Sequence, residues 1–159
     1  MDNEEQMAPY VIPPALIDSP GFLLNRSARI IRDMNNTVLK PLGLSVRDLG
    51  LLRVIGSEGP LTQQELSSKH KTDRTTIVEV IDGLEERKLV VRSTNVKDRR
   101  SYLLTITPRG AKLLAAANKM TDKEKRNFLQ ALNDDEWQNL RALLTRIIIF
   151  HESREPCES

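Results

Sequence analysis

Residues 61–107 decide the fold of this chain, and they read LTQQELSSKHKTDRTTIVEVIDGLEERKLVVRSTNVKDRRSYLLTIT. Thr62 and Glu65 have the T-x-x-E spacing of a capping box, which predicts a short helix beginning at Gln63. After a turn, a second helix is predicted to begin near Asp73. Three apolar residues with the spacing of one buried helix face follow there: Ile77, Ile81 and Leu84.

Two strands are predicted after these helices. Residues 89–91 and 102–106 are rich enough in β-branched and aromatic side chains to form strands, and a polar loop joins them. This loop ends in Asp98, Arg99 and Arg100, which gives the hairpin a basic tip. Two helices followed by such a hairpin form a winged helix-turn-helix, an arrangement that reads duplex DNA. The stretch therefore predicts a DNA-binding lobe.

Further helices are predicted before this lobe. One spans about 21–40, and a second begins after the N-cap Ser45 and runs through Ile55, where Gly56 and Gly59 end it. The predicted fold class is therefore mainly α with a small β-hairpin wing.

Composition limits the class of protein. With 39% hydrophobic and 29% charged residues, the chain is typical of soluble globular proteins. No apolar run approaches the roughly 20 residues that cross a bilayer, and the acidic N-terminus lacks the pattern of a secretory signal. The single cysteine, Cys157, excludes an internal disulfide and a CxxC metal site. We expect a cytoplasmic protein without a metal ion or other cofactor.

The charge is small overall but unevenly distributed. The net charge is +2, whereas Leu61 to Lys112 holds 11 Lys or Arg against 7 Asp or Glu, which gives +4 and leaves −2 for the rest. A local basic patch can bind DNA, because counterion release depends on the charges that face phosphate. A solvated turn is the alternative explanation of this cluster.

The string DRRSYLLTITPRG, placed after a helix ending GLEERKLV, resembles the MarR (multiple antibiotic resistance regulator) family. The resemblance covers about residues 20–150. It implies a homodimeric winged-helix regulator of transcription, commonly a repressor, and not an enzyme.

The predicted recognition helix supplies the candidate base contacts. Its N-terminal turn should enter the major groove, where Arg can bridge guanine O6 and N7 and Thr can contact a base edge or a thymine methyl. We expect these contacts from Arg74, Thr75 and Thr76, with capping or packing as the alternative for the threonines. Side chains on the preceding helix and turn are better placed for phosphates: Gln63, Gln64, Ser68, Lys69 and Lys71.

The wing supplies a second candidate contact. The resemblance implies an arginine at the tip, inserted in the minor groove and braced by an aspartate, which here are Arg100 and Asp98. A narrow A·T-rich minor groove attracts arginine because its negative potential is focused. Lys97 and Arg99 are expected to lie against the DNA backbone.

Two positions on the recognition helix depart from the family pattern. Relatives commonly carry Arg or Lys where this chain has Glu79 and Gly83. A carboxylate there could accept a hydrogen bond from a cytosine amino group, repel phosphate, or form a salt bridge within the protein.

The chain ends carry more apolar surface than a small domain covers alone. A long helix is predicted from about Thr107 with Pro108 in its first turn, and a last helix is capped by Asn133 or Asp134. Internal packing must use some of this surface, and the remainder predicts a dimer interface. The residues expected in it are Val11, Ile12, Leu16, Ile17, Leu144, Ile147 and Ile148.

The resemblance also implies a small aromatic or phenolic effector, held between the first helices, the long helix and the DNA-binding lobe, whose binding releases the operator. Three arginines on bordering helices could receive a carboxylate or phenolate, although a surface or interface role is the alternative for each: Arg29, Arg32 and Arg53.

These expectations divide the chain into five parts. They are a flexible tail (1–12), an N-terminal dimerisation segment with the first helix (13–44), the DNA-binding lobe (45–107), the C-terminal dimerisation helices (108–151) and a second flexible tail (152–159).

Three other functions fit the sequence less well. The sequence lacks the residue groups of an enzyme site. His70 and His151 have no Cys, Asp or Glu at metal-ligand spacing, and no Gly-rich phosphate loop occurs. A redox-responsive regulator would depend on Cys157, whose neighbours Glu155 and Glu158 oppose thiolate formation. A winged helix used only for protein contact would not need the basic wing.

Overall fold

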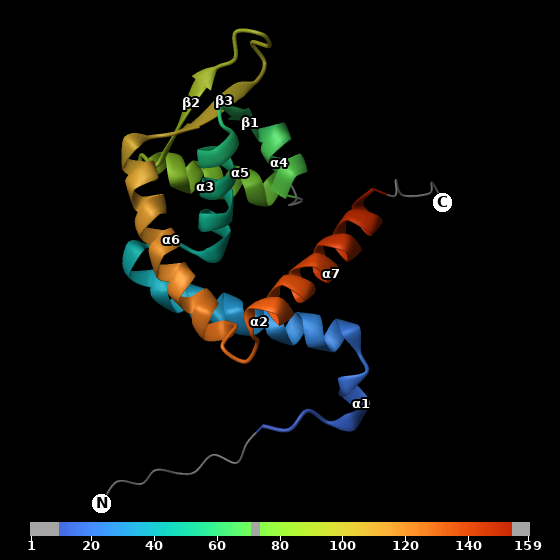
Figure 1. Ribbon diagram of the computed structural model, residues 1–159. Helices are drawn as coiled ribbons and strands as arrows, with labels where there is room; N and C mark the ends of the chain where they lie inside the picture. The colour runs from blue at the N-terminus through green and yellow to red at the C-terminus, as the bar shows by residue number, and fades with distance from the viewer. Residues whose placement is uncertain (1–9, 71–73, 154–159) are drawn as a thin grey trace, which may run out of the picture.

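The computed structural model describes residues 10–70 and 74–153, and Figure 1 gives its arrangement. The elements in chain order are α1 (Pro14–Ile17), α2 (Pro20–Leu39), a short 3-10 helix (Lys40–Leu42), α3 (Val46–Glu58), β1 (Leu61–Thr62), α4 (Gln63–His70), α5 (Arg74–Glu86), β2 (Val90–Thr94), β3 (Tyr102–Ile106), α6 (Pro108–Phe128) and α7 (Asp134–Glu152).

Local capping sets the helix boundaries. The Ser19 hydroxyl accepts from Phe22 N–H at 3.3 Å and starts α2. Capping boxes start α3, through Ser45 and Asp48, and α7, through Asn133 and Glu136. Each box satisfies backbone N–H groups that the first helical turn leaves without partners. The predicted starts of these helices are confirmed to within a residue.

The hydrophobic core lies in the DNA-binding lobe. Helices α3, α4 and α5 surround it, the antiparallel sheet in the order β1-β3-β2 covers one side, and Ala117 of α6 reaches it. The predicted inner face of α5 is confirmed, because Ile77, Ile81 and Leu84 are each at most 1% exposed. The other fully buried large side chains are Leu39, Leu51, Leu52, Ile55, Leu66, Leu89, Val90 and Leu104.

Four details differ from the sequence-based predictions. Helix α3 continues through Gly56 to Glu58, and β2 reaches Thr94 rather than residue 91. Strand β1 and the one-turn helix α1 were not predicted at all. The C-cap of α3 is Gly59, whose N–H still donates to the Ile55 carbonyl at 2.9 Å. A Cβ at Gly59 would lie 2.4 Å from that carbonyl oxygen, so a side chain does not fit there.

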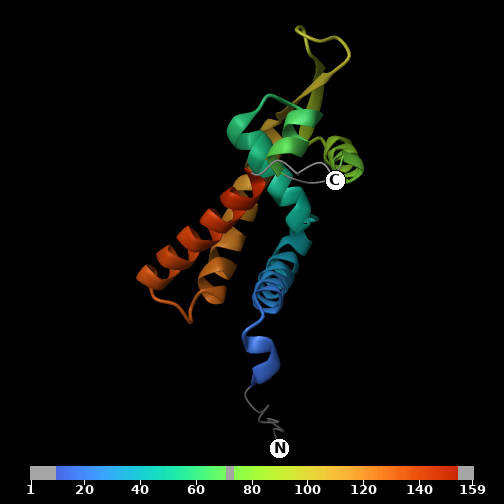
Figure 2. The same ribbon diagram turned by 90° about the vertical axis from the view of Figure 1, so that its right-hand side faces the viewer.

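The N-terminal helices lie at the opposite end from the wing. Figures 1 and 2 show α1 and α2 far from the β2–β3 hairpin, and Figure 1 shows α7 diverging from α6. Helix α7 has no buried residue and α2 has only Leu39. The molecule therefore has one well-covered lobe and one open, helical end.

Candidate nucleic-acid interface

Helix α5 presents its outer face to solvent. Residues Thr75, Glu79, Asp82 and Glu86 follow the i, i+4, i+7, i+11 spacing of one helix side, and all four are exposed. Thr76 is half-buried at the edge of this face. Of the other predicted contacts, Lys71 lies outside the described residues. Arg74 is described only as the first residue of the helix.

The tip of the wing is a hydrogen-bonded turn. The Asp98 carboxylate accepts from Arg100 N–H at 3.0 Å, and the Asp98 carbonyl accepts from Ser101 N–H at 3.0 Å. At the base of the turn, the Asn95 side chain accepts from Lys97 N–H and donates to the Ser101 hydroxyl, each at 3.0 Å. The Asp98 and Asn95 side chains therefore hold the backbone of the turn, and the Lys97, Arg99 and Arg100 side chains take no part in holding it.

This turn holds three cations in solvent. Lys97, Arg99 and Arg100 are all exposed, and no ion pair holds them within the described part of the chain. Asp98 braces the backbone of Arg100 rather than its guanidinium. Asp98 therefore supports Arg100 through the Arg100 backbone N–H. The charged groups of Lys97, Arg99 and Arg100 remain available to phosphate.

Arg92 joins the wing to the recognition helix, and the sequence analysis missed this role. From β2, its guanidinium contacts the Asp82 carboxylate of α5 at 2.5 Å and also pairs with Glu85. Partial burial opposes the charge, yet the hydrogen bonds to Asp82 and Glu85 raise the pKa of Arg92 above its ordinary value. The sequence does contain a signal for this pairing: Asp82 and Glu85 lie within one helical turn of each other, and Arg92 follows on the next strand.

Helix α4 is fixed by its predicted capping box. Thr62 N–H donates to the Glu65 carboxylate at 2.7 Å, and Glu65 N–H donates to the Thr62 hydroxyl at 3.2 Å. Hydrogen bonds from the Thr62 backbone and hydroxyl lower the pKa of Glu65. The start of α4 at Gln63 is confirmed.

The predicted phosphate contacts of α4 differ in their surroundings. Gln64 and Ser68 are exposed, whereas Gln63 is half-buried. The Lys69 ammonium pairs with the Glu58 carboxylate of α3 at 2.6 Å, and hydrogen bonding to Glu58 raises the pKa of Lys69. The charge of Lys69 is thus partly compensated within the protein, so Lys69 is less suited to contact a phosphate than an unpaired lysine.

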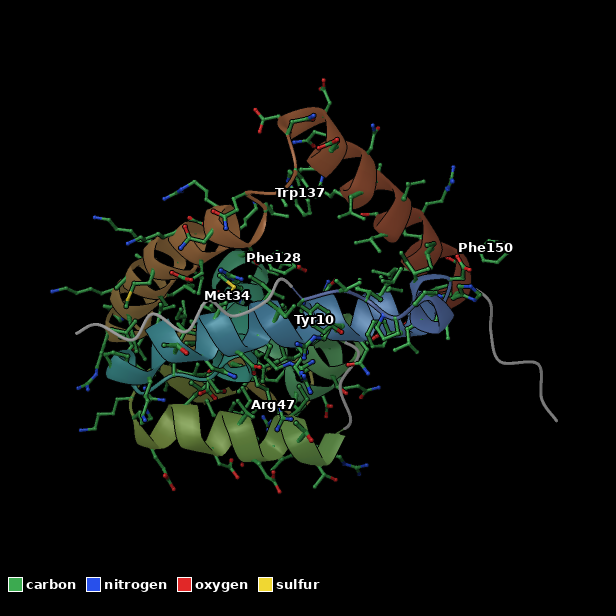
Figure 3. The ribbon with its side chains drawn as sticks, turned by 90° about the horizontal axis from the view of Figure 1, so that it is seen from below. Tyr10, Met34, Arg47, Phe128, Trp137 and Phe150 are labelled. Carbon is green, nitrogen blue, oxygen red and sulfur yellow. The ribbon has the colours of Figure 1, made fainter. Side chains whose placement is uncertain are left out.

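An apolar groove of about 930 Å³ lies between α2, α6 and α7. Figure 3 shows Phe128 and Trp137 between these helices. Apolar side chains predominate in its lining, among them Leu24, Ile31, Phe128, Leu132, Trp137 and Leu144.

One of the three predicted ligand arginines, Arg53, lines this groove. Arg53 donates through Nε to Asn118 at 2.8 Å and through Nη2 to Thr121 at 3.0 Å, which leaves Nη1 directed to neither. The Asn35 side-chain oxygen, which also lines this groove, is buried without a hydrogen-bond partner in the described part of the molecule. Arg29 lines a separate, smaller pocket near Tyr10, and Arg32 lines neither.

Neither a candidate metal site nor a membrane-spanning helix is found in residues 10–70 and 74–153. Within them, no three or more His, Cys, Asp and Glu side chains are grouped so as to hold a metal ion. None of the helices in these ranges is both long enough and apolar enough to span a membrane. Cys157, on which a redox function would depend, lies outside the described residues.

Comparison with known proteins agrees with this geometry. A model of the MarR family matches residues 44–102. The chain is also 34% identical over 128 residues to a protein of Thauera aromatica named as a transcriptional regulatory protein for the hcr operon, covering 80% of this chain and 77% of the relative. The chain belongs to the MarR family.

Solved structures of the MarR family have the same fold. A MarR-family transcriptional regulator from Rhodococcus sp. RHA1 is 31% identical, with a TM-score of 0.77 and coverage of 85% of this chain and 96% of that one. CouR from Rhodococcus jostii RHA1, solved with p-coumaroyl-CoA, is 32% identical, with a TM-score of 0.74 and coverage of 85% and 95%. The predicted winged-helix fold is confirmed, and this MarR-family protein is a DNA-binding transcriptional regulator.

Proposed function

We propose that this MarR-family protein is a homodimeric, sequence-specific repressor that a small aromatic or phenolic effector releases from its operator. The observation that carries the DNA-binding part is the turn at 97–100, which holds three exposed cations at the tip of a hairpin whose strand β2 contacts α5. Two contact surfaces on adjoining elements fit two adjacent grooves of one duplex. Because it acts on the genome, we place it in the cytoplasm.

The proposed DNA contacts divide by role. Arg74, Thr75 and Thr76 read bases in the major groove, and Arg100 enters the minor groove while Lys97 and Arg99 lie on phosphates. Asp98 holds the turn through its hydrogen bond to Arg100 N–H. Residues of α4 and the following turn position the lobe on the backbone through Gln63, Gln64, Ser68, Lys69 and Lys71.

The dimer is proposed from uncovered apolar surface. Along α7, Leu143, Ile147, Ile148, Ile149 and Phe150 are each 49–60% exposed. The N-terminal segment adds Val11 and Ile17, while Ile12, Leu16 and Leu144 are half-buried. Exposed apolar side chains gathered on α7 and on the N-terminal segment are typical of an interface, and a two-fold dimer matches two-fold DNA sites. Residues 13–44 and 108–151 are the proposed dimerisation parts, and 45–107 is the DNA-binding part.

The effector is proposed to occupy the groove between α2, α6 and α7. There Arg53 can receive a carboxylate or phenolate, and the Asn35 oxygen can accept a hydrogen bond from a ligand hydroxyl. Arg29 and Arg32 lie elsewhere, so Arg53 is the favoured contact of the three. That CouR binds p-coumaroyl-CoA supports an aromatic acyl ligand class for related chains. Effector binding that changes the spacing of the two lobes would release DNA.

Footprinting on the DNA upstream of the protein's own gene tests the proposal. The expected result is a protected pseudo-palindrome whose affinity falls steeply with salt. Arg100→Ala should weaken binding at every sequence and reduce the salt slope by about 1. Unchanged binding by Arg100→Ala would remove the wing from the mechanism. If aromatic acids bind the protein to saturation but do not release it from DNA, the effector part of the proposal is contradicted.

A further inference from the structure

The outer face of the recognition helix is acidic, which is unusual for a surface that approaches DNA. Three of its four members carry carboxylates: Glu79, Asp82 and Glu86. DNA repels such groups unless a partner neutralises them or a base donates a hydrogen bond to them. Each carboxylate therefore requires its own explanation.

Arg92 accounts for one of these carboxylates. Its guanidinium holds Asp82 at 2.5 Å and pairs with Glu85 one helical turn further on, so the two carboxylates share one positive charge within the protein. Glu86 is the last residue of α5, and Arg87 and Lys88 follow it directly. It lies about 10 Å along the helix axis from Glu79, at the end remote from the predicted base contacts.

Glu79 is the exception. It is exposed and no hydrogen bond or ion pair engages it among residues 10–70 and 74–153. It stands four residues after Thr75, so the two side chains are neighbours on the outer face. The salt-bridge explanation considered from sequence therefore finds no partner in the described residues, and the DNA-facing explanation gains support.

We propose that Glu79 is a specificity-determining residue that selects cytosine at one position of each operator half-site. Cytosine presents only its N4 amino donor in the major groove, whereas guanine presents two acceptors and thymine one. Adenine offers an amino group beside the N7 acceptor, which repels a carboxylate. A glutamate at this place therefore favours cytosine and disfavours the other three bases.

In vitro selection from duplexes with randomised half-sites tests this inference, which rests on the proposed sequence-specific function. Wild-type protein, Glu79→Gln, Glu79→Ala and the control Glu86→Gln are compared as full-length chains. The wild type should enrich cytosine at one symmetric position, with roughly 10-fold weaker binding when that base is replaced. Glu79→Gln should change the preference there to adenine, because glutamine pairs with N6 and N7 together. Glu79→Ala should lose the preference, and Glu86→Gln should keep it.

The possible outcomes separate this inference from the proposed function. If the wild type selects a sequence and Glu79→Gln selects the same one, the inference is overturned while the proposed function stands. A uniform gain in affinity for Glu79→Gln without a changed base preference also overturns it, because Glu79 then acts only by repulsion. If the wild type enriches no sequence at all, the proposed function itself is contradicted.

Discussion

The DNA-binding lobe and the terminal helices bury their apolar side chains to very different extents. In the lobe, the large apolar residues of α3, α4 and α5 that form the core are at most 2% exposed. Helix α7 also carries large apolar side chains, but none of its residues is buried within the chain. Burial of apolar area is the main favourable term in folding. The lobe therefore carries its own stability, whereas the terminal helices require a partner to cover them.

The largest effect is expected from the core of the lobe. Leu66→Ala removes a side chain that is 0% exposed and should lower the free energy of unfolding by about 2–5 kcal/mol. Leu143→Ala is the matched change in α7, where the residue is 49% exposed within the chain. Denaturant unfolding at several protein concentrations should show a concentration-independent loss for Leu66→Ala. If Leu66→Ala and Leu143→Ala lower the free energy of unfolding by similar amounts at every protein concentration, the proposed difference between the lobe and α7 is contradicted.

A charge in the uncovered surface of α7 should act on assembly instead. Ile148→Arg places an unpaired charge in the proposed interface and should weaken the dimer by about 2–4 kcal/mol. Analytical ultracentrifugation would detect this as a shift toward monomer, with Gln138→Arg on the exposed helix surface as the control. If Ile148→Arg remains as dimeric as the wild type, α7 is not part of the interface.

Loss of the Arg92 contacts should have an intermediate effect within the lobe. Arg92→Ala separates β2 from Asp82 and Glu85, and should cost about 1 kcal/mol of stability because both carboxylates are partly exposed. The free energy of DNA binding should fall by more than the free energy of unfolding, since two carboxylates of α5 lose the one positive charge that they share. Arg92→Lys should restore part of the affinity. Equal affinity for all three proteins would show that these contacts do not matter for DNA.

The smallest effect is expected at the start of α4. Because the folded pKa of Glu65 is lowered, its contribution to stability is present above the ordinary pKa of about 4.3 and is lost as pH falls through the folded value. Thermal unfolding of Glu65→Ala should show a slightly lower melting temperature at pH 7, and the difference should narrow below about pH 4. A difference that persists unchanged at acidic pH would contradict the capping role.

Local signals in the sequence predicted much of the fold. The Thr62–Glu65 box, Ser45 and Thr107 predicted helix starts because capping depends on residues three apart. Long-range packing was not predictable in this way. Helix α3 continues through Gly56 because Ile55 is buried in the core, and the two-residue β1 exists only by pairing with β3.

The candidate site was predicted in part. The polar loop between the two predicted strands is visible in the local sequence, and it predicted that the cations of the wing would be exposed. The pairing of Arg92 with Asp82 and Glu85 depends on how β2 lies against α5, and the pairing of Lys69 with Glu58 depends on how α4 lies against α3. Such contacts require the tertiary structure. The separation of Arg53 from Arg29 and Arg32 likewise depends on which helices border the groove.

Hydroxyl-radical footprinting of the intact protein on its operator, with the mass of the complex measured in parallel, tests the central claim most directly. A dimer joined through the terminal helices predicts two chains per duplex and two protected half-sites centred about 34–36 Å apart. One chain per duplex, or a single protected stretch without a symmetric mate, would contradict it.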